Sequence, residues 1–195
     1  KYLASKQIDG IGIVGTGIQA RMQLEYLKLV TDCREVFILG RNKEKISKYI
    51  EVMKSHGFNI NIVSDSKELC KNSNLIVTTT NANESLIYKD DVKEGTHITA
   101  MGSDTPDKRE LDPRILNIAD TVIVDSIPQC LERGETKNAL DRNLIKKEDL
   151  IEIGSIIDSG KKLRKNNNEI TVADLTGVAV QDIMITNAVY EQLIK

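Results

Sequence analysis

The chain has 195 residues, of which 40% are hydrophobic and 29% are charged, and its formal net charge is −2. This length fits one domain, or one domain with part of another, and the composition predicts a buried core rather than disorder. The nearly balanced charge gives no electrostatic reason to expect a nucleic acid or an anionic membrane as a partner. The sequence has no apolar run near the roughly 20 residues of a membrane span, and its first residues are not typical of a secretory signal.

The cysteines and histidines bear on disulfide formation and on metal binding. The three cysteines, Cys33, Cys70 and Cys130, are widely spaced and form no CxxC pair. We therefore expect reduced thiols and a cytoplasmic protein. The two histidines, His56 and His97, are too few for a histidine-based zinc site, and we expect no metal.

The first 125 residues alternate between short apolar runs and helical patterns. Residues 18–30 and 43–54 carry apolar side chains at helical spacing. Six runs rich in apolar or β-branched residues predict strands, at 11–14, 36–39, 60–63, 75–79, 97–101 and 121–124. Short strands joined by helices are parallel and buried on both faces. We predict a Rossmann-type, doubly wound, mainly parallel α/β sheet of about six strands, with a ligand at the first β–α turn.

The alternation changes after residue 125. Residues 127–134 and 150–157 have helical patterns, residues 161–168 indicate an exposed loop, 170–173 a short strand, and 178–193 a final helix. The basic first half of the loop is interpreted as a solvated turn rather than a binding patch.

Start signals support three of the helices. Asn42 can cap the second helix, and Asp112 stands before a proline that suits a first helical turn. Asp65 and Glu68 have the spacing of a capping box.

The strongest local motif is the sequence GTGIQA at residues 15–20, a GxGxxA pattern directly after the first predicted strand. Gly15 permits a tight turn, Gly17 lets the backbone approach a pyrophosphate, and Ala20 lets the following helix pack closely on the sheet. The helix N-terminus offers unpaired N–H groups to phosphates. We predict dinucleotide binding here. The alternatives are a plain strand–helix corner and the similar glycine turn of a methyltransferase.

The end of the second predicted strand bears on the type of dinucleotide. Gly40 stands 20 positions after Ala20, where an acid that binds the ribose of NAD is expected, and Arg41 follows it. A small residue followed by arginine suits a 2′-phosphate, because guanidinium binds phosphate oxygens as a fork. We therefore expect NADP(H) to be favoured over NAD(H). The alternative is that Arg41 stacks on adenine or faces solvent.

A second group of segments gives a family. The stretch at residues 97–111, HITAMGSDTPDKREL, resembles the signature loop of the ornithine cyclodeaminase/mu-crystallin family. Further segments resemble that family in the same order, at residues 1–4, 15–20, 125–126, 128–129 and 173–182. The resemblance implies a two-domain, usually dimeric enzyme that uses NAD(P)(H) on amino or imino acids, as cyclodeaminases, alanine dehydrogenases and ketimine reductases do.

The same resemblance implies roles for individual residues. Asp104 matches the catalytic carboxylate that exchanges a proton with the substrate, and Thr176 matches a position beside the substrate. The matching cofactor contacts are Ile18, Gln19, Thr80, Met101, Gly102, Ser103, Lys108 and Leu175. The position of Asp104 after a parallel strand agrees with a general acid or base, although Asp-Thr-Pro is also an ordinary turn. His97 is interpreted as a satisfied core residue.

Three departures from the family pattern limit the prediction. Gly40 and Arg41 replace the acid of NAD-using members, and Leu175 stands where several members have a small polar residue. The family's catalytic lysine and the arginines that bind the substrate carboxylate belong to a domain that precedes the match to residues 1–4. We therefore expect residues 8–176 to form the NAD(P)-binding domain. We expect residues 1–7 and 177–195 to be helical segments that pack on, or lead to, an N-terminal substrate and dimerisation domain.

These observations predict hydride transfer at the α-carbon of an amino or imino acid, by a homodimer whose substrate is a small molecule. One alternative is a redox-neutral cyclodeaminase that releases ammonia from an ornithine-like substrate. Another is a non-catalytic, nucleotide-gated binding protein. The chain alone is expected to bind cofactor without catalysing a reaction, because orientation of the substrate requires groups on both sides of a cleft.

Overall fold

The structure, a computed structural model, describes residues 2–194. Its strands are β1 (Ile11–Val14), β2 (Glu35–Leu39), β3 (Asn59–Ile62), β4 (Leu75–Thr78), β5 (His97–Ala100), β6 (Thr121–Val124), β7 (Leu150–Glu152) and β8 (Thr171–Asp174). Its helices are α1 (Ile18–Leu27), α2 (Lys43–Ser55), α3 (Ser66–Asn72), α4 (Arg114–Ile118), α5 (Ile127–Cys130), α6 (Gly134–Leu140), α7 (Ile153–Ser159) and α8 (Ala179–Leu193). Two 3-10 turns, η1 (Lys89–Asp91) and η2 (Lys147–Asp149), are also present.

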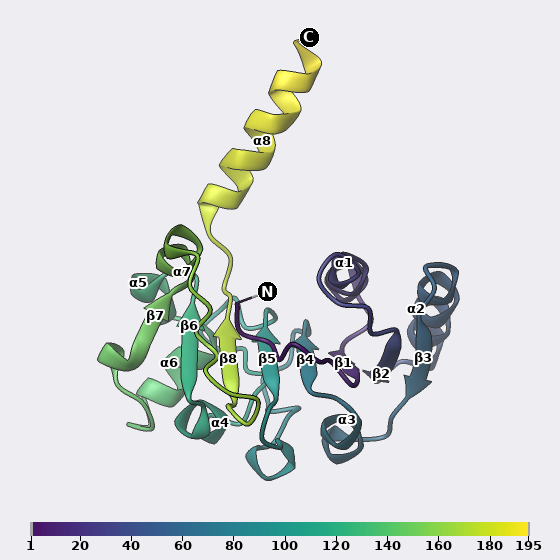
Figure 1. The fold of residues 1–195 in the computed structure, drawn as a ribbon, viewed down its shortest axis with the longest axis horizontal. Helices are drawn as coiled ribbons and strands as arrows, with labels where there is room; N and C mark the ends of the chain where they lie inside the picture. The colour runs from purple at the N-terminus through teal and green to yellow at the C-terminus, as the bar shows by residue number, and fades with distance from the viewer. Residues whose placement is uncertain (1, 195) are drawn as a thin grey trace.

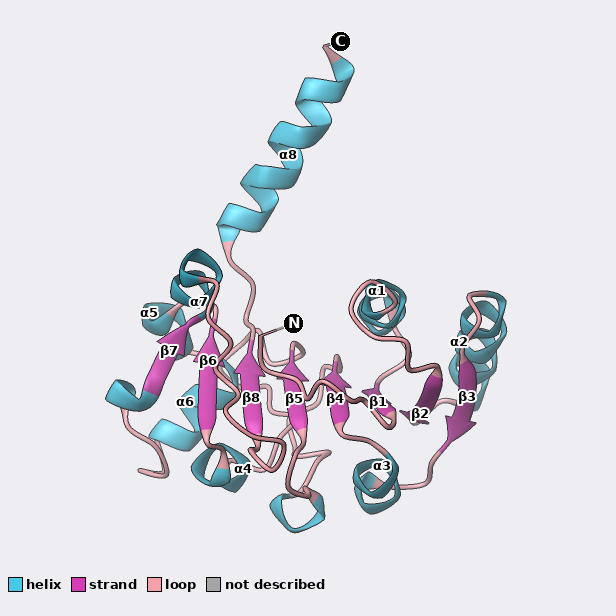
Figure 2. Cartoon of the chain, in the orientation of Figure 1, coloured by secondary structure: helices cyan, strands magenta, loops and turns pink. Residues whose placement is uncertain are grey.

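The strands form one sheet in the order β3-β2-β1-β4-β5-β8-β6-β7, and the neighbouring strands are parallel (Figure 2). In β1, Ile13 lies opposite Ile38 of β2 and Val77 of β4. The chain winds from β1 outward to β3 and then returns to β4 on the other side of β1. The winding therefore reverses at the first β–α turn, which confirms the predicted doubly wound fold and its switch point.

Helices cover the two faces of this sheet. In Figures 1 and 2, α1 and α2 lie on one face, and α3 and α4 lie on the other. Successive strand residues serve opposite faces: Ile13 packs with Leu24 and Tyr49 under α1 and α2, and Val14 packs in the cluster that contains Leu69. These side chains are almost fully buried. Burial on both faces explains why the strands are continuous apolar runs without polar alternation.

The sheet has eight strands in the described residues, and the prediction of about six was too low. Residues 150–157 were expected to be one helix, but 150–152 form the edge strand β7 and only Ile153–Ser159 are helical. β7 has three residues, too few to show a strand period, and it is held by its pairing with β6. A contact between distant segments therefore decides this element.

The helix expected at residues 127–134 is also divided. α5 ends at Cys130 and α6 begins at Gly134, whose φ is +90°. This left-handed backbone interrupts the helical path, and it favours glycine because a side chain would be strained there. A Cβ at this position would lie 2.7 Å from the Asp174 Oδ2 atom.

Residues 2–7 do not form the helix expected near the N-terminus. Leu3 is buried beside Ile123 and Ile156, and its carbonyl accepts a hydrogen bond from the Arg164 guanidinium at 2.5 Å. Arg164 also donates to the Glu169 carbonyl at 2.6 Å. The loop was correctly predicted, but Arg164 is a structural residue rather than part of a solvated turn.

Helix α8 agrees with the prediction of a final helix and has an unusual position. It extends away from the sheet as the last element (Figure 1), and none of its residues is buried. Large apolar side chains are exposed along its length: Val180, Ile183, Met184, Ile185, Val189, Tyr190 and Leu193. A helix with so much apolar surface is stable in water only when a partner covers it.

The predicted helix starts are partly confirmed. The Asn42 side chain caps α2 by accepting a hydrogen bond from the Lys45 N–H at 2.9 Å. Asp65 caps α3 in the same way, but Glu68 accepts from the Ser64 N–H, one residue before the expected capping-box donor. Asp112 accepts from the N–H of Arg114, the first residue of α4.

Candidate functional site

The glycine turn joins β1 to α1 at the switch point. Gly15 has a φ of +112°, and its N–H donates to the Leu39 carbonyl at 2.9 Å. A Cβ at Gly15 would lie 2.7 Å from the Thr79 Oγ1 atom. Both the backbone conformation and the surrounding space therefore require glycine, as the tight turn predicts.

Gly17 is required by neither of these constraints. It is exposed, its φ is −80°, and a Cβ built on it would meet no described atom within 4 Å. No side chain in the described residues caps α1, and its first turn carries no acid. The N–H groups of this turn therefore face open space, which suits an anionic ligand.

The other residues of the motif divide between the ligand side and the core. Ile18 is 75% exposed, and Gln19 is exposed beside it. Ala20 is fully buried, and its carbonyl accepts a hydrogen bond from the Tyr49 hydroxyl at 3.2 Å. The small side chain therefore permits close packing of α1 on the sheet, as predicted.

The residues after β2 border the same turn. A Cβ on Gly40 would lie 3.1 Å from the Thr16 Cγ2 atom and 3.2 Å from Ile46. A larger residue would therefore push against both the glycine turn and α2. Arg41 is exposed immediately after this small residue, with its side chain accessible to a ligand.

The loop after β5 places Asp104 beside Lys108. The Lys108 ammonium donates to the Asp104 carboxylate at 2.6 Å and to the Asn81 side chain at 3.1 Å. The Asp104 side chain remains 53% exposed. Lys108 therefore links the loop after β5 to the loop after β4 and orients an accessible carboxylate. Two residues that the family resemblance assigns to one site do lie together.

A buried carboxylate, Glu110, lies beneath these two loops. It accepts hydrogen bonds from the Thr78 hydroxyl at 2.7 Å, the Thr80 N–H at 2.5 Å and the Gly102 N–H at 2.8 Å. Burial raises the pKa of Glu110, and these hydrogen bonds oppose the rise.

Glu135, in the first turn of α6, lies beneath Glu110. Its carboxylate accepts from the Ser103 hydroxyl, from the Glu110 N–H at 2.7 Å and from the Leu111 N–H at 3.1 Å. Burial raises the pKa of Glu135 to about 8, and the nearby Asp174 carboxylate adds to the rise. Ser103 and Gly102 are both buried, whereas Met101 is half-buried.

The residues after β8 lie at the same carboxyl edge of the sheet as the loops after β4 and β5. The Leu175 N–H donates to the Ala100 carbonyl at 2.9 Å, which places Leu175 beside the end of β5. The buried Thr176 hydroxyl donates to Asp125 at 3.2 Å and accepts from Gln129 at 2.5 Å. These contacts fix the chain where it leaves the sheet towards α8.

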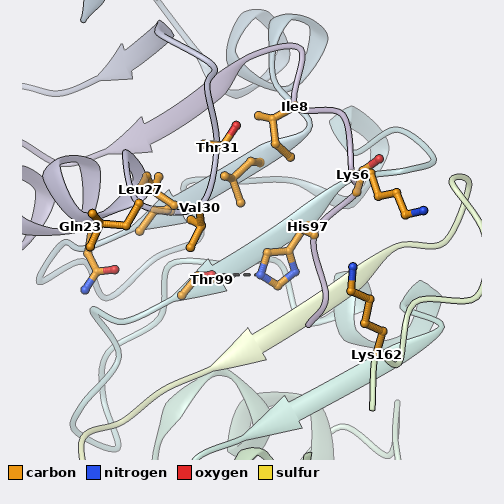
Figure 3. Close-up of a pocket in the computed structure, with 14 residues that line it drawn as sticks. Lys6, Ile8, Gln23, Leu27, Val30, Thr31, His97, Thr99 and Lys162 are labelled. Carbon is orange, nitrogen blue, oxygen red and sulfur yellow. Dashed lines mark hydrogen bonds between the residues drawn. The ribbon is translucent and has the colours of Figure 1, made fainter. Parts of the chain in front are cut away.

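A cavity of about 700 Å³ lies away from this edge, over β4 and β5 between α1 and the N-terminal segment (Figure 3). None of the predicted site residues lines it. His97 faces it with both ring nitrogens hydrogen-bonded, Nδ1 to Thr171 at 2.9 Å and Nε2 to Thr99 at 3.1 Å. Burial lowers the pKa of His97 to about 3, so the ring is neutral at physiological pH. This agrees with the prediction of a satisfied core histidine.

The predicted site residues thus follow the carboxyl ends of five strands, β1, β2, β4, β5 and β8. Thr80 connects two groups of them, because its side chain lies near Gly15 and its N–H binds Glu110. Sequence reasoning missed Glu110 and Glu135. Glu110 lies inside the stretch that carried the resemblance, and that position was the one available signal.

The parallel sheet, its strand order and the glycine turn at the switch point define a Rossmann-type domain. The chain belongs to the ornithine cyclodeaminase/mu-crystallin family, whose model matches residues 1–195. No helix in the described residues is long and apolar enough to cross a membrane.

Individual relatives agree with this family. An alanine dehydrogenase of Archaeoglobus fulgidus is 35% identical over 192 residues, which are 98% of this chain and 59% of that protein. A structure of an archaeal alanine dehydrogenase dimer with bound NAD is 34% identical and has a TM-score of 0.92, with 99% of this chain and 60% of that one covered. The Thermococcus litoralis Delta(1)-pyrroline-2-carboxylate reductase in complex with NADH and L-proline is 29% identical and has a TM-score of 0.91, with the same coverage. The chain therefore spans about 60% of the length of these relatives.

Proposed function

We propose that this chain is the cofactor-binding part of an NAD(P)-dependent oxidoreductase that acts at the α-carbon of an amino or imino acid. The observation that carries the proposal is the uncapped start of α1 at Gly17, on the same sheet edge as the accessible Asp104–Lys108 pair. The similarity to an alanine dehydrogenase with bound NAD and to a reductase with bound NADH and L-proline supports it.

The residues present fit a dinucleotide. The open space over Gly17 and the N–H groups of residues 18–20 suit the pyrophosphate, which carries negative charge. Thr80 and residues 101–103 border the path from this corner towards Asp104. A bound nicotinamide ring supplies hydride transfer. The chain's own contribution is to hold and orient that ring.

Asp104 is the group that we assign to proton transfer. Its carboxylate is accessible, and the Lys108 ammonium fixes its Oδ1 atom at 2.6 Å. A positioned carboxyl group can give a proton to an imine nitrogen when it is a carboxylic acid, or take one from an amine when it is a carboxylate. Lys108 orients that carboxylate.

We propose that NADP(H) is favoured over NAD(H). Gly40 leaves no acid to repel a 2′-phosphate, and Arg41 presents an exposed guanidinium next to the glycine turn. One charge-assisted hydrogen bond contributes about 1.5–3 kcal/mol, which corresponds to roughly ten- to a hundredfold in affinity.

We propose further that residues outside this chain complete the substrate site and that the protein is a homodimer. The greater length of the relatives and the uncovered apolar side chains of α8 support a division in which residues 177–195 pack on that additional part. The three cysteines are free thiols, which supports a cytoplasmic location.

The proposal is tested by turnover of the protein that carries this chain. It is assayed with alanine, ornithine, proline and cyclic imines, and the nicotinamide absorbance is recorded together with released ammonia. Net consumption or formation of NAD(P)H with one of these substrates is expected. Ammonia release without net redox change would identify a cyclodeaminase, and dinucleotide binding without turnover would identify a binding protein.

A further inference from the structure

We propose that Glu110 and Glu135 are positioning residues that tie the loops after β4 and β5 together, so that Thr80, Asp104 and Lys108 stand in the arrangement that the reaction needs. The inference rests on the proposed function, since those loops are its site. Neither glutamate reaches the exposed edge, because both are fully buried.

Glu110 joins the loops directly. One carboxylate oxygen accepts the Thr80 N–H from the loop after β4, and the other accepts the Gly102 N–H from the loop after β5. The fit is tight, because a Cβ on Gly102 would lie 2.4 Å from Glu110 and 2.1 Å from the Thr80 carbonyl. Displacement of this carboxylate would therefore move both loops.

Glu135 fixes Glu110 in turn. It holds the Glu110 N–H and the Leu111 N–H, and it accepts from the hydroxyl of Ser103, the residue next to Asp104. The two glutamates therefore form two layers beneath the loop that carries the Asp104–Lys108 pair. A shift of Glu135 would reach Asp104 through Ser103.

The energetic cost of this arrangement favours a role beyond folding. Burial raises the pKa of both glutamates, and Glu135 also faces Asp174 on β8, whose pKa burial raises to about 6. Each of these groups is therefore less stable as a carboxylate in the folded protein than in water. Apolar packing would stabilise a core at least as well as such groups do. A carboxyl, however, has two oxygens that together accept from three donors, as each of these glutamates does.

The test compares Glu110→Gln and Glu135→Gln with a matched control, Glu169→Gln. Glu169 is also buried and accepts the Lys165 N–H at 2.8 Å, but it precedes β8 at the opposite edge of the sheet. An amide keeps the shape of each side chain and places N–H donors against backbone donors. In the protein that carries this chain, we expect Glu110→Gln and Glu135→Gln to lower kcat by about 10- to 100-fold, with substrate KM nearly unchanged.

Hydrogen exchange gives a readout that does not require activity. The Thr80 and Gly102 amides should exchange faster in Glu110→Gln, and the Leu111 amide faster in Glu135→Gln, whereas Glu169→Gln leaves all three protected. If a glutamine variant fails to fold, Ser103→Ala removes a single hydroxyl and should give a smaller loss of kcat in the same direction.

The outcomes separate the two proposals. Normal kcat and unchanged exchange in the glutamine variants, or an equal loss of kcat in Glu169→Gln, would overturn the positioning role. Faster exchange in variants of a protein that neither binds dinucleotide nor turns over substrate would support the tie between the loops and refute the proposed function.

Discussion

The two sides of the switch point are built in opposite ways. At the β1–α1 corner, Gly15 makes the tight turn, and the N–H groups of α1 after Gly17 face open space, with no side chain capping the helix in the described residues. On the β5–β8 side, Glu110, Glu135 and Asp174 are buried. The two glutamates accept from donors of the loops after β4 and β5, and Asp174 accepts from the Thr136 N–H of α6. One side therefore removes side chains from the ligand edge, and the other packs polar side chains beneath it.

The difference matches two chemical tasks. A pyrophosphate needs several N–H donors and room for close approach, which short local backbone can supply. Proton transfer needs one carboxylate held at a fixed place, and this requires support from several distant segments. We infer that the corner provides most of the dinucleotide affinity and that the buried carboxyls provide most of the geometry for the reaction.

The largest effect on activity is expected at Asp104, the carboxylate that the buried glutamates hold in place. In the protein that carries this chain, Asp104→Asn should keep dinucleotide affinity and lower kcat by about 10²–10⁴-fold, because the amide cannot exchange a proton. Asp107→Asn, an exposed change in the same loop, is the control. Near-normal kcat in Asp104→Asn would show that this aspartate is only a turn residue.

A smaller effect is expected beside the glycine corner. Arg41→Ala should weaken NADP(H) binding by roughly ten- to a hundredfold and leave NAD(H) binding nearly unchanged, since one charge-assisted phosphate contact is lost. Titration calorimetry of both dinucleotides measures this, with the exposed Arg142→Ala as control. Equal affinity of the wild-type chain for the two dinucleotides would contradict the role of Arg41.

The exposed helix gives a third test. The 195-residue chain should self-associate in sedimentation velocity, because the apolar side chains of α8 are exposed to water and a second copy would cover them. Ile183 and Tyr190 are seven residues apart and share a helix face, so the double variant Ile183→Glu/Tyr190→Glu should sediment as a monomer. A wild-type chain that is monomeric at high concentration would argue against an interface on α8.

The smallest effect concerns pH and the buried carboxyls. The pKa values of Glu135 and Asp174 are raised to about 8 and about 6, so these groups bind protons more tightly folded than unfolded. Their unfavourable ionisation is absent at pH 4 and grows as pH rises towards 8, so the free energy of unfolding should fall over this range. Each kcal/mol lost lowers Tm by about 2–4 °C in a protein of this size. Glu135→Gln should flatten the dependence, and an unchanged slope would refute the assignment.

The two sides also differ in how far the sequence predicts them. The sequence motif alone predicts the glycine corner, because Gly15, Gly17 and Ala20 act within one local turn. The family resemblance brought Asp104 and Lys108 to one site, and the structure places them 2.6 Å apart. By contrast, Glu110 and Glu135 gain their surroundings from strands and loops distant in sequence, and local pattern does not encode such burial.

The wrong predictions of secondary structure have the same physical origin. β7 exists through its pairing with β6, and Leu3 lies in a non-helical segment whose carbonyl is bound by Arg164. In both places, contacts between distant segments override the local helical pattern. The split between α5 and α6 has a local signal, because Gly134 takes a left-handed backbone conformation that favours glycine.

The central claim is that a nicotinamide dinucleotide binds at the corner formed by Gly15 and Gly17. Calorimetric titration of NADPH and NADH into the chain and its Gly17→Val variant tests this claim most directly. A Cβ at Gly17 meets no described atom, so the variant should melt at the wild-type temperature, while its side chain fills the space of the pyrophosphate. We predict measurable binding by the wild-type chain and none by Gly17→Val. Equal affinity of a folded Gly17→Val variant would contradict the account.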